Sequence, residues 1–164
     1  GDGNLVRGNV ASPDLRGRGG GIFAGYGSHS SLVNTVLQDN ASGATTDSDG
    51  AALLLEVATA EMAHTTFVNN YGGDGSGVYV YGGSAIILTN TLMSGHTAAI
   101  TVDAGSAATL VGILWHNTTI QTGGDGTVEV SYVITGDPTF AYDGYHLESR
   151  GMVSRPGQGQ RWNR

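Results

Sequence analysis

Short runs in which apolar residues alternate with small or polar residues recur along the chain, at intervals that shorten from 30 to 26, 22 and 20 residues. Four segments can be superimposed as 22-residue frames, namely residues 19–40, 49–70, 75–96 and 97–118, and a degenerate fifth copy ends near Asp137. Alternation with a period of two predicts β-strands. A repeat of 20 to 50 residues is typical of a solenoid, in which each repeat buries its apolar face against its neighbours.

Aligned frames predict three strands per repeat and columns of side chains that stack along the solenoid. For the first strand, the inward columns are Ile22, Ala52, Val78, Ile100 and Ala24, Leu54, Val80, Val102. For the second strand, they are Leu32, Met62, Leu88, Leu110, Val130 and Ser30, Ala60, Ile86, Ala108, Val128. For the third strand, the column is Val36, Thr66, Leu92, Leu114, Ile134. Two aromatic columns are expected to face outward, Phe23 with Tyr79, and Phe67 with Trp115, the latter with Leu37 and Met93 between them.

Two further columns mark bends in the chain. Small residues precede the first strand at Gly21, Ala51, Gly77 and Ala99, which permits a tight corner. The second and third strands are separated by Asn34, His64, Asn90, Gly112 and Tyr132. Because asparagine bonds well at bends, we expect a partial asparagine ladder in this column.

The predicted fold is all-β, a right-handed single-stranded parallel β-helix of about five coils with three short strands per coil. A leucine-rich repeat is the rival fold, and the glycine-rich, β-branched return segments fit it poorly. We divide the chain into a partial first coil with an inserted loop (1–18), the β-helix coils (19–138), and a closing segment with a tail (139–164).

The charge distribution excludes one class of partner. The formal net charge is −7, and no basic residue lies between residues 19 and 149. Nucleic-acid binding needs a basic surface, so we expect no nucleic-acid partner. The chain has no apolar run long enough to span a membrane as a helix, and no cysteine for a disulfide or a thiolate metal site. It starts without methionine and inside a repeat, which we interpret as a piece of a longer secreted precursor.

Four segments of the chain carry a family resemblance. They are the runs GGGIFAG, LVNTVLQDN and ILTNTLMSG and the segment GDPTFAYDGYHL at 136–147. They resemble the right-handed parallel β-helix repeats of bacterial secreted and surface proteins in the pectate-lyase-like superfamily. The resemblance covers almost the whole chain and implies an extracellular or cell-surface location. It leaves the activity open, because the superfamily includes lyases, hydrolases, adhesins and structural proteins.

Insertions interrupt the repeat at residues 10–18, 41–48 and 71–74, with lengths that decrease from nine to eight to four. All three follow the same column, so we expect the loops to emerge from one edge. Loops on a rigid scaffold commonly carry binding residues. The expected ridge, a candidate site for carbohydrate or Ca²⁺, contains Asp14, Arg16, Arg18, Asp47, Asp49, Tyr71 and Asp74. The alternative is a set of solvated loops without a ligand.

Calcium is the one cofactor that the motifs suggest. Asp47, Asp49, Asp74 and Asp125 lie in glycine-rich turns and offer the oxygen ligands that Ca²⁺ prefers. No complete calcium-binding nonapeptide or EF-hand loop is present.

Signs of catalysis are few, and we assign no catalytic residue. The repeat body contains no arginine or lysine base of the kind that lyases of the resembled family use. Glu56 and Glu61 flank one strand but have no partner on a neighbouring coil. His64 and His96 replace asparagines in stacked columns, and no histidine spacing indicates zinc.

The sequence therefore favours a non-catalytic extracellular structural or adhesive module. Its expected partners are other copies, joined end to end by strand stacking into a fibre, or upstream coils of a longer chain, and polysaccharide. The alternative is a carbohydrate-active enzyme, a polysaccharide lyase or glycoside hydrolase, or a carbohydrate-binding fragment of one.

Overall fold

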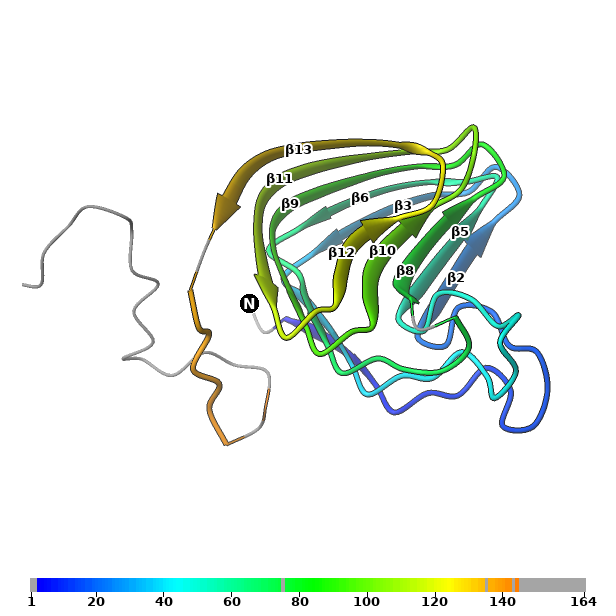
Figure 1. Cartoon of the computed structure of the whole chain (residues 1–164), viewed down its shortest axis with the longest axis horizontal. Coiled ribbons are helices and arrows are strands. Elements are labelled where there is room, and N and C mark those ends of the chain that lie inside the picture. The colour runs from blue at the N-terminus through cyan, green and yellow to red at the C-terminus, as the bar shows by residue number, and fades with distance from the viewer. Residues whose placement is uncertain (1–2, 75, 135, 143, 145–164) are drawn as a thin grey trace, which may run out of the picture.

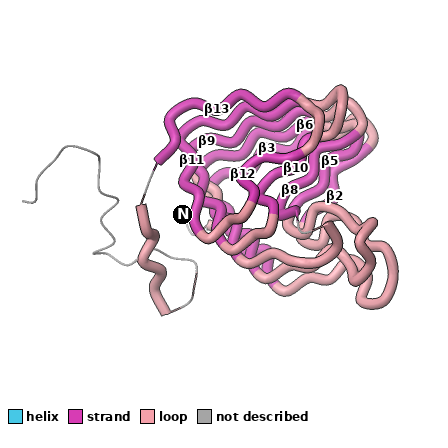
Figure 2. Tube along the Cα trace, in the orientation of Figure 1, coloured by secondary structure: helices cyan, strands magenta, loops and turns pink. Residues whose placement is uncertain are grey.

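The computed structural model describes residues 3–74, 76–134, 136–142 and 144, and these residues form an all-β, solenoid-like stack (Figure 1). Strands pair in parallel with the equivalent strand of the next repeat, and no helix occurs within the described ranges. Two sheets enclose a common apolar interior, and the loops gather at one corner (Figure 2). The all-β architecture with parallel strands that the repeat predicts is confirmed.

The two sheets divide the strands of each repeat between them. The five-stranded sheet contains, in spatial order, β12 (Ile120–Gly123), β10 (Ala98–Val102), β8 (Ser76–Tyr81), β5 (Leu53–Glu56) and β2 (Ile22–Gly25). The eight-stranded sheet runs through β1 (Asn4–Arg7), β4 (Thr35–Gln38), β7 (Thr66–Val68), β9 (Ala85–Ser94), β11 (Ala107–His116) and β13 (Thr127–Ile134), with β3 (His29–Val33) pairing β6 (Thr59–Ala63) and β6 pairing β9.

The predicted columns of the second strand are confirmed residue by residue. Leu32 aligns with Met62, which aligns with Leu88, and the column continues through Leu110 to Val130. Met62, Leu88 and Leu110 are almost completely buried in the main core cluster. Alternation is clean in these strands, so period-two reasoning identified both the register and the buried face.

The predicted inward column of the third strand is wrong, although its residues do align. Leu37, Phe67 and Met93 are fully buried in the main core, while Leu92 and Leu114 face outward in a separate small cluster. The cause is the bend column, whose five members all have positive φ: Asn34 (52°), His64 (54°), Asn90 (50°), Gly112 (70°) and Tyr132 (58°). One left-handed residue turns the chain and shifts the alternation by one position.

Because of that shift, Phe67 is a core residue and not an outward-facing aromatic. Trp115 also packs partly against the main core. Strict alternation across the bend had placed both rings on the surface, and the corner residue reversed the faces.

The first strand of the second repeat is displaced by one residue from its predicted register. Leu53, not Ala52, aligns with Ile22 and Val78, and Leu55 takes the place predicted for Leu54. By the same register the small-residue column passes through Ala52, not Ala51. The turn between β5 and β6 has two residues, Val57 and Ala58, whereas the turns between β2 and β3 and between β8 and β9 have three. The deletion was invisible because the run AALLL contains no alternation.

An asparagine ladder is present, but in a different column from the one predicted. Asn9 Nδ2 donates to Asn40 Oδ1 (2.9 Å), and Asn40 Nδ2 donates to Asn70 Oδ1 (3.0 Å). Asn70 Nδ2 lies 3.3 Å from Nε2 of His96, which ends the row. The backbone N–H groups of Asn9 and Asn40 also donate along the ladder. These amides satisfy buried polar groups at the corner where the insertions begin.

The described part of the closing segment packs on the outer face of the eight-stranded sheet. Phe140 and Ile134 pack against Val68, Leu92 and Leu114. Asp137 Oδ1 lies 3.1 Å from Nε2 of His116. The remainder of the predicted closing element and the tail, residues 145–164, lie outside the described residues.

Candidate functional site

The three inserted loops stack on one another as a continuous ridge at one corner of the solenoid (Figure 1). Parallel bridges join Val10 to Ala41 and Ala41 to Tyr71, and a further bridge joins Arg18 to Asp49. Backbone hydrogen bonds continue between them, from Ser12 N–H to Ser42 O (3.2 Å) and from Gly73 N–H to Gly43 O (3.0 Å). The structure thus brings the loops together at a single edge.

The predicted decrease in loop length needs one correction. The bridges at Val10–Ala41 and Arg18–Asp49 enclose segments of equal length, 10–18 and 41–49, so the second loop includes Asp49. The third loop is shorter, and in the following repeat Thr97 leads directly into β10. The ridge therefore stops abruptly after the third loop.

Arg16 links the first two loops through charge. Its Nε donates to the backbone oxygen of Asp47 (2.8 Å), and its Nη2 lies 3.4 Å from Oδ2 of Asp49. Asp47 Oδ2 is 3.8 Å from the same guanidinium. Arg16 and Asp47 are more than half exposed, so this contact contributes little to stability on its own.

Arg18 is more enclosed and reaches the five-stranded sheet. Its Nη1 donates to Oε2 of Glu56 (3.1 Å), and its Nε lies 3.9 Å from Oδ2 of Asp49. The guanidinium carbon lies 6.0 Å from the ring centroid of Phe23 and 5.5 Å from that of Tyr81, within cation–π range. Arg18 therefore fastens the ridge to the outer face of the sheet.

The partly buried carboxylate and phenol beside this contact have shifted pKa values. Burial raises the pKa of Asp49, and the nearby charge of Asp74 adds to the shift, while Arg16 and Arg18 oppose it. Burial also raises the pKa of Tyr79, with further contributions from Asp49 and Asp103. At the exposed end, the hydrogen bond from Thr45 lowers the pKa of Asp47. The outer face next to the ridge is thus an acidic environment.

The calcium candidates are not gathered into one site. Asp47 and Asp49 face arginine, and Asp74 Oδ1 accepts hydrogen bonds from the N–H (3.0 Å) and hydroxyl (2.6 Å) of Ser76. Asp125 lies in the turn between β12 and β13, away from the loops. Within the described residues no group of three or more His, Asp or Glu side chains could hold a metal ion. Asp14 is exposed and takes no part in these contacts.

The outer face of the five-stranded sheet exposes a row of aromatic rings next to the ridge. Phe23 aligns with Leu54 and then with Tyr79, and Tyr81 lies beside Tyr79 with ring centroids 6.3 Å apart. Phe23 and Tyr81 are exposed, Tyr79 is half-buried, and Leu54 is covered. Sequence reasoning found the Phe23–Tyr79 column but not Tyr81, and it considered Glu56 only as a carboxylate without a partner, whereas the structure pairs it with Arg18. The two-residue alternation that makes Tyr79 face outward also predicts an outward position two residues later, where Tyr81 aligns with Glu56.

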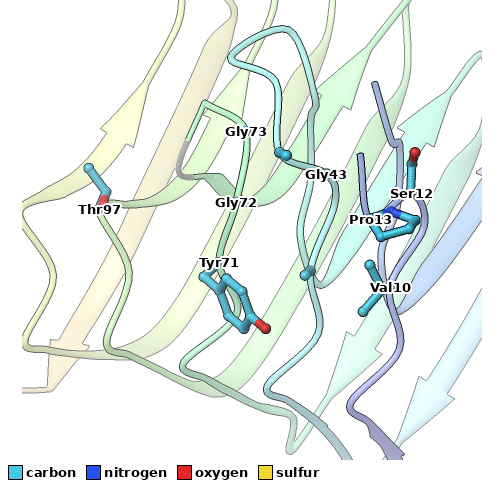
Figure 3. Close-up of a pocket in the computed structure, with 10 residues that line it drawn as sticks. Val10, Ser12, Pro13, Gly43, Tyr71, Gly72, Gly73 and Thr97 are labelled. Atoms are coloured by element: carbon cyan, nitrogen blue, oxygen red, sulfur yellow. The ribbon is translucent and has the colours of Figure 1, made fainter. Parts of the chain in front are cut away.

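A groove of about 540 Å³ lies on the opposite flank of the ridge (Figure 3). None of its lining residues belongs to a strand of the five-stranded sheet. Tyr71, the one aromatic residue in the lining, projects beside the glycine backbone of the loops (Figure 3). The lining consists of Val10, Ser12, Pro13, Ala41, Gly43, Ala44, Tyr71, Gly72, Gly73 and Thr97. The structure therefore separates Tyr71 from the charged ridge residues with which it was grouped.

Comparison with known proteins returns no matching family model, no matching curated protein and no matching solved structure. In the ranges that the structure describes, no helix is long and apolar enough to cross a membrane. Two surfaces border the ridge, the aromatic row on the five-stranded sheet and the groove beside Tyr71.

Proposed function

We propose that this chain is a non-catalytic, extracellular adhesion module, a right-handed β-helix of about five coils, that binds polysaccharide on the outer face of its five-stranded sheet. The parallel pairing of equivalent strands, about one repeat apart, supports the β-helix assignment. The aromatic row beside the ridge supports the binding function.

The observation that carries the proposal is the combination of Phe23, Tyr79 and Tyr81 with carboxylates on one rigid face. A sugar ring presents C–H groups on its faces and hydroxyl groups around its edge. Aromatic rings pack against the former, and the side chains of Asp74 and Asp103 can accept hydrogen bonds from the latter. Strands β2 and β8 hold the three rings in place, and Asp74 and Asp103 lie in the loop before β8 and the turn after β10.

The charges on this face favour a neutral polysaccharide over an acidic one. Arg16 and Arg18 are already paired with Asp47, Asp49 and Glu56. The negative charges of Asp49, Asp74 and Asp103 all reach Tyr79, where they raise its pKa together with burial. An anionic polymer would meet like charge there and bind poorly.

Affinity electrophoresis tests the proposal with the full chain in gels that contain soluble xylan, glucomannan, mixed-linkage β-glucan or polygalacturonate. We expect at least one neutral polymer to retard the protein and polygalacturonate not to do so. The double variant Tyr79→Ala/Tyr81→Ala should lose the retardation. Tyr142→Ala removes an exposed ring that lies outside the sheet and serves as the matched control.

Two results would count against the proposal. Retardation by no neutral polymer, or by polygalacturonate alone, would remove the assigned ligand class. Release of reducing ends from a retarding polymer, abolished by Asp49→Asn, would replace the non-catalytic module with a glycoside hydrolase.

A further inference from the structure

The groove that contains Tyr71 arises from the way in which the ridge ends. Val10, Ala41 and Tyr71 form one bridged column, and Thr97 continues it because His96 follows Asn70 in the ladder. An inserted loop starts at each of the first three positions of this column but not at the fourth. The groove is the resulting step, walled by loops and open towards Thr97 (Figure 3).

The walls of the groove are held by backbone contacts that admit no side chain. A Cβ atom at Gly73 would overlap the backbone of Ser48, and one at Gly72 would lie 2.8 Å from the carbonyl oxygen of Gly43. Both glycines have positive φ, 55° and 105°. The groove is therefore formed before any ligand binds, which lowers the entropic cost of binding.

The chemistry of the lining is uncharged and amphipathic. Val10, Pro13 and Ala44 supply small apolar surfaces, and the lining contains no Asp, Glu, Arg or His. The hydroxyl of Ser12 accepts a hydrogen bond from Leu15 N–H (3.1 Å) and keeps its own proton to donate. Thr97 and Tyr71 contribute two further hydroxyl groups.

Tyr71 supplies the flat surface. Tyr71 is 59% exposed although it lines the groove, so it is accessible to a ligand. The volume lies within the range of about 300 to 1,000 Å³ that is usual for small-molecule sites. The lining offers no opposite charge to an ionic ligand, and the net charge of −7 further disfavours anions.

We propose that this groove is a second binding site, which takes one or two neutral sugar units stacked on Tyr71. A sugar ring matches the lining because its C–H face packs against an aromatic ring. The hydroxyl groups at its edge form hydrogen bonds with side-chain hydroxyl groups and the backbone. The inference does not depend on the sheet-face site, because the two sites share no residue. If both sites bind, one molecule can bridge two glycan chains across the ridge.

The test is a titration of the uniformly ¹⁵N-labelled full chain with the neutral hexaoses of glucose, xylose and mannose, followed by amide chemical shifts. We expect at least one hexaose to shift the amides of Ser12, Gly72, Gly73 and Thr97. Tyr71→Ala should weaken this binding about tenfold or more, which corresponds to the loss of one stacking contact. Tyr71→Phe keeps the ring and should retain binding within about threefold.

The double variant Tyr79→Ala/Tyr81→Ala separates this inference from the proposed function. It should abolish shifts on the sheet face and leave the shifts in the groove unchanged. Shifts confined to the sheet face, binding unaffected by Tyr71→Ala, or a response to an acidic hexaose alone would each overturn the groove proposal. Wild-type-like amide spectra of the variants verify that they are folded.

Discussion

His96 occupies the place in the buried ladder where a further asparagine would continue the row. Its Nε2 faces Asn70, and its Nδ1 is buried without a hydrogen-bond partner in the described residues. Gly77 lies against the imidazole, and a Cβ there would come within 2.7 Å of the ring. Burial lowers the pKa of His96 to about 4, and no neighbouring charge contributes.

This environment predicts a loss of stability in acid. In the unfolded chain the histidine takes up a proton near its ordinary pKa, about 6.5, whereas in the folded chain it stays neutral down to about pH 4. The unfolded state therefore binds more protons between these values, and the free energy of unfolding falls as the pH drops from 6.5 to 4. The difference amounts to about 3 kcal/mol. Urea unfolding at pH 7.0 and 4.5 measures it.

His96→Asn is the informative variant because asparagine extends the ladder and does not titrate. We expect it to remove most of the acid-dependent loss relative to the wild type. His64→Asn is the matched control, since His64 is exposed and asparagine tolerates its positive φ of 54°. Equal pH profiles for His96→Asn and wild type would show that acid destabilisation arises elsewhere.

At the level of single sites, the sequence predicted which residues share an edge but not which contacts they make. Loop residues were grouped correctly because insertions at equivalent positions of a solenoid must lie side by side. The separation of the ion pairs of Arg18 from the uncharged groove at Tyr71 depends on the direction of the side chains. That direction is set by turns inside the loops, which carry no periodicity.

Among elements, the bend between the second and third strands has the largest effect on the pattern of burial. Each repeat places one left-handed residue there, and the residue types range from asparagine to glycine, histidine and tyrosine. Left-handed backbone costs a residue with a Cβ about 1 to 2 kcal/mol, and β-branched residues more. The bend therefore stores a measurable backbone penalty.

Asn90 is suited to test this penalty because its side chain is exposed within the long strand β9. We expect Asn90→Val to lower the free energy of unfolding by about 1 to 2 kcal/mol, and Asn90→Gly to leave it within about 0.5 kcal/mol. Ala85→Val, at an exposed position of the same strand, is the control and should be near neutral. Equal effects of valine at both positions would contradict the backbone explanation. Thermal and urea unfolding provide the values.

The same bend explains how far the fold could be predicted. Alternation gave the correct register for the second strand, and the repeat gave the correct parallel stacking. Alternation failed at Phe67 because one left-handed residue reversed the faces. It failed at Leu53 because the turn after β5 is one residue shorter and the run AALLL has no alternation that would reveal the shift. Both errors are single-residue events at corners, where neither hydrophobic period applies.

For the whole molecule, the last described repeat leaves its inward-facing side chains uncovered. Val130 and Val133 are 45% and 51% exposed, while Leu110 and Ile113, one repeat earlier in the same columns, are fully buried. Among the described residues, β12 and β13 each pair with a strand on one side only. An apolar core end bordered by open strand edges favours pairing with another chain.

We therefore predict that the full chain associates with further copies through this end, by strand addition. The weight-average mass from light scattering should rise above the 16.8 kDa of one chain as the concentration increases. Val130→Lys should keep the protein monomeric, because a lysine at the open end opposes edge pairing. Ile87→Lys introduces the same charge on an exposed outward position of β9, a strand paired on both sides, and should leave association unchanged. A constant monomer mass for the wild type, or equal behaviour of the two lysine variants, would refute association through this end.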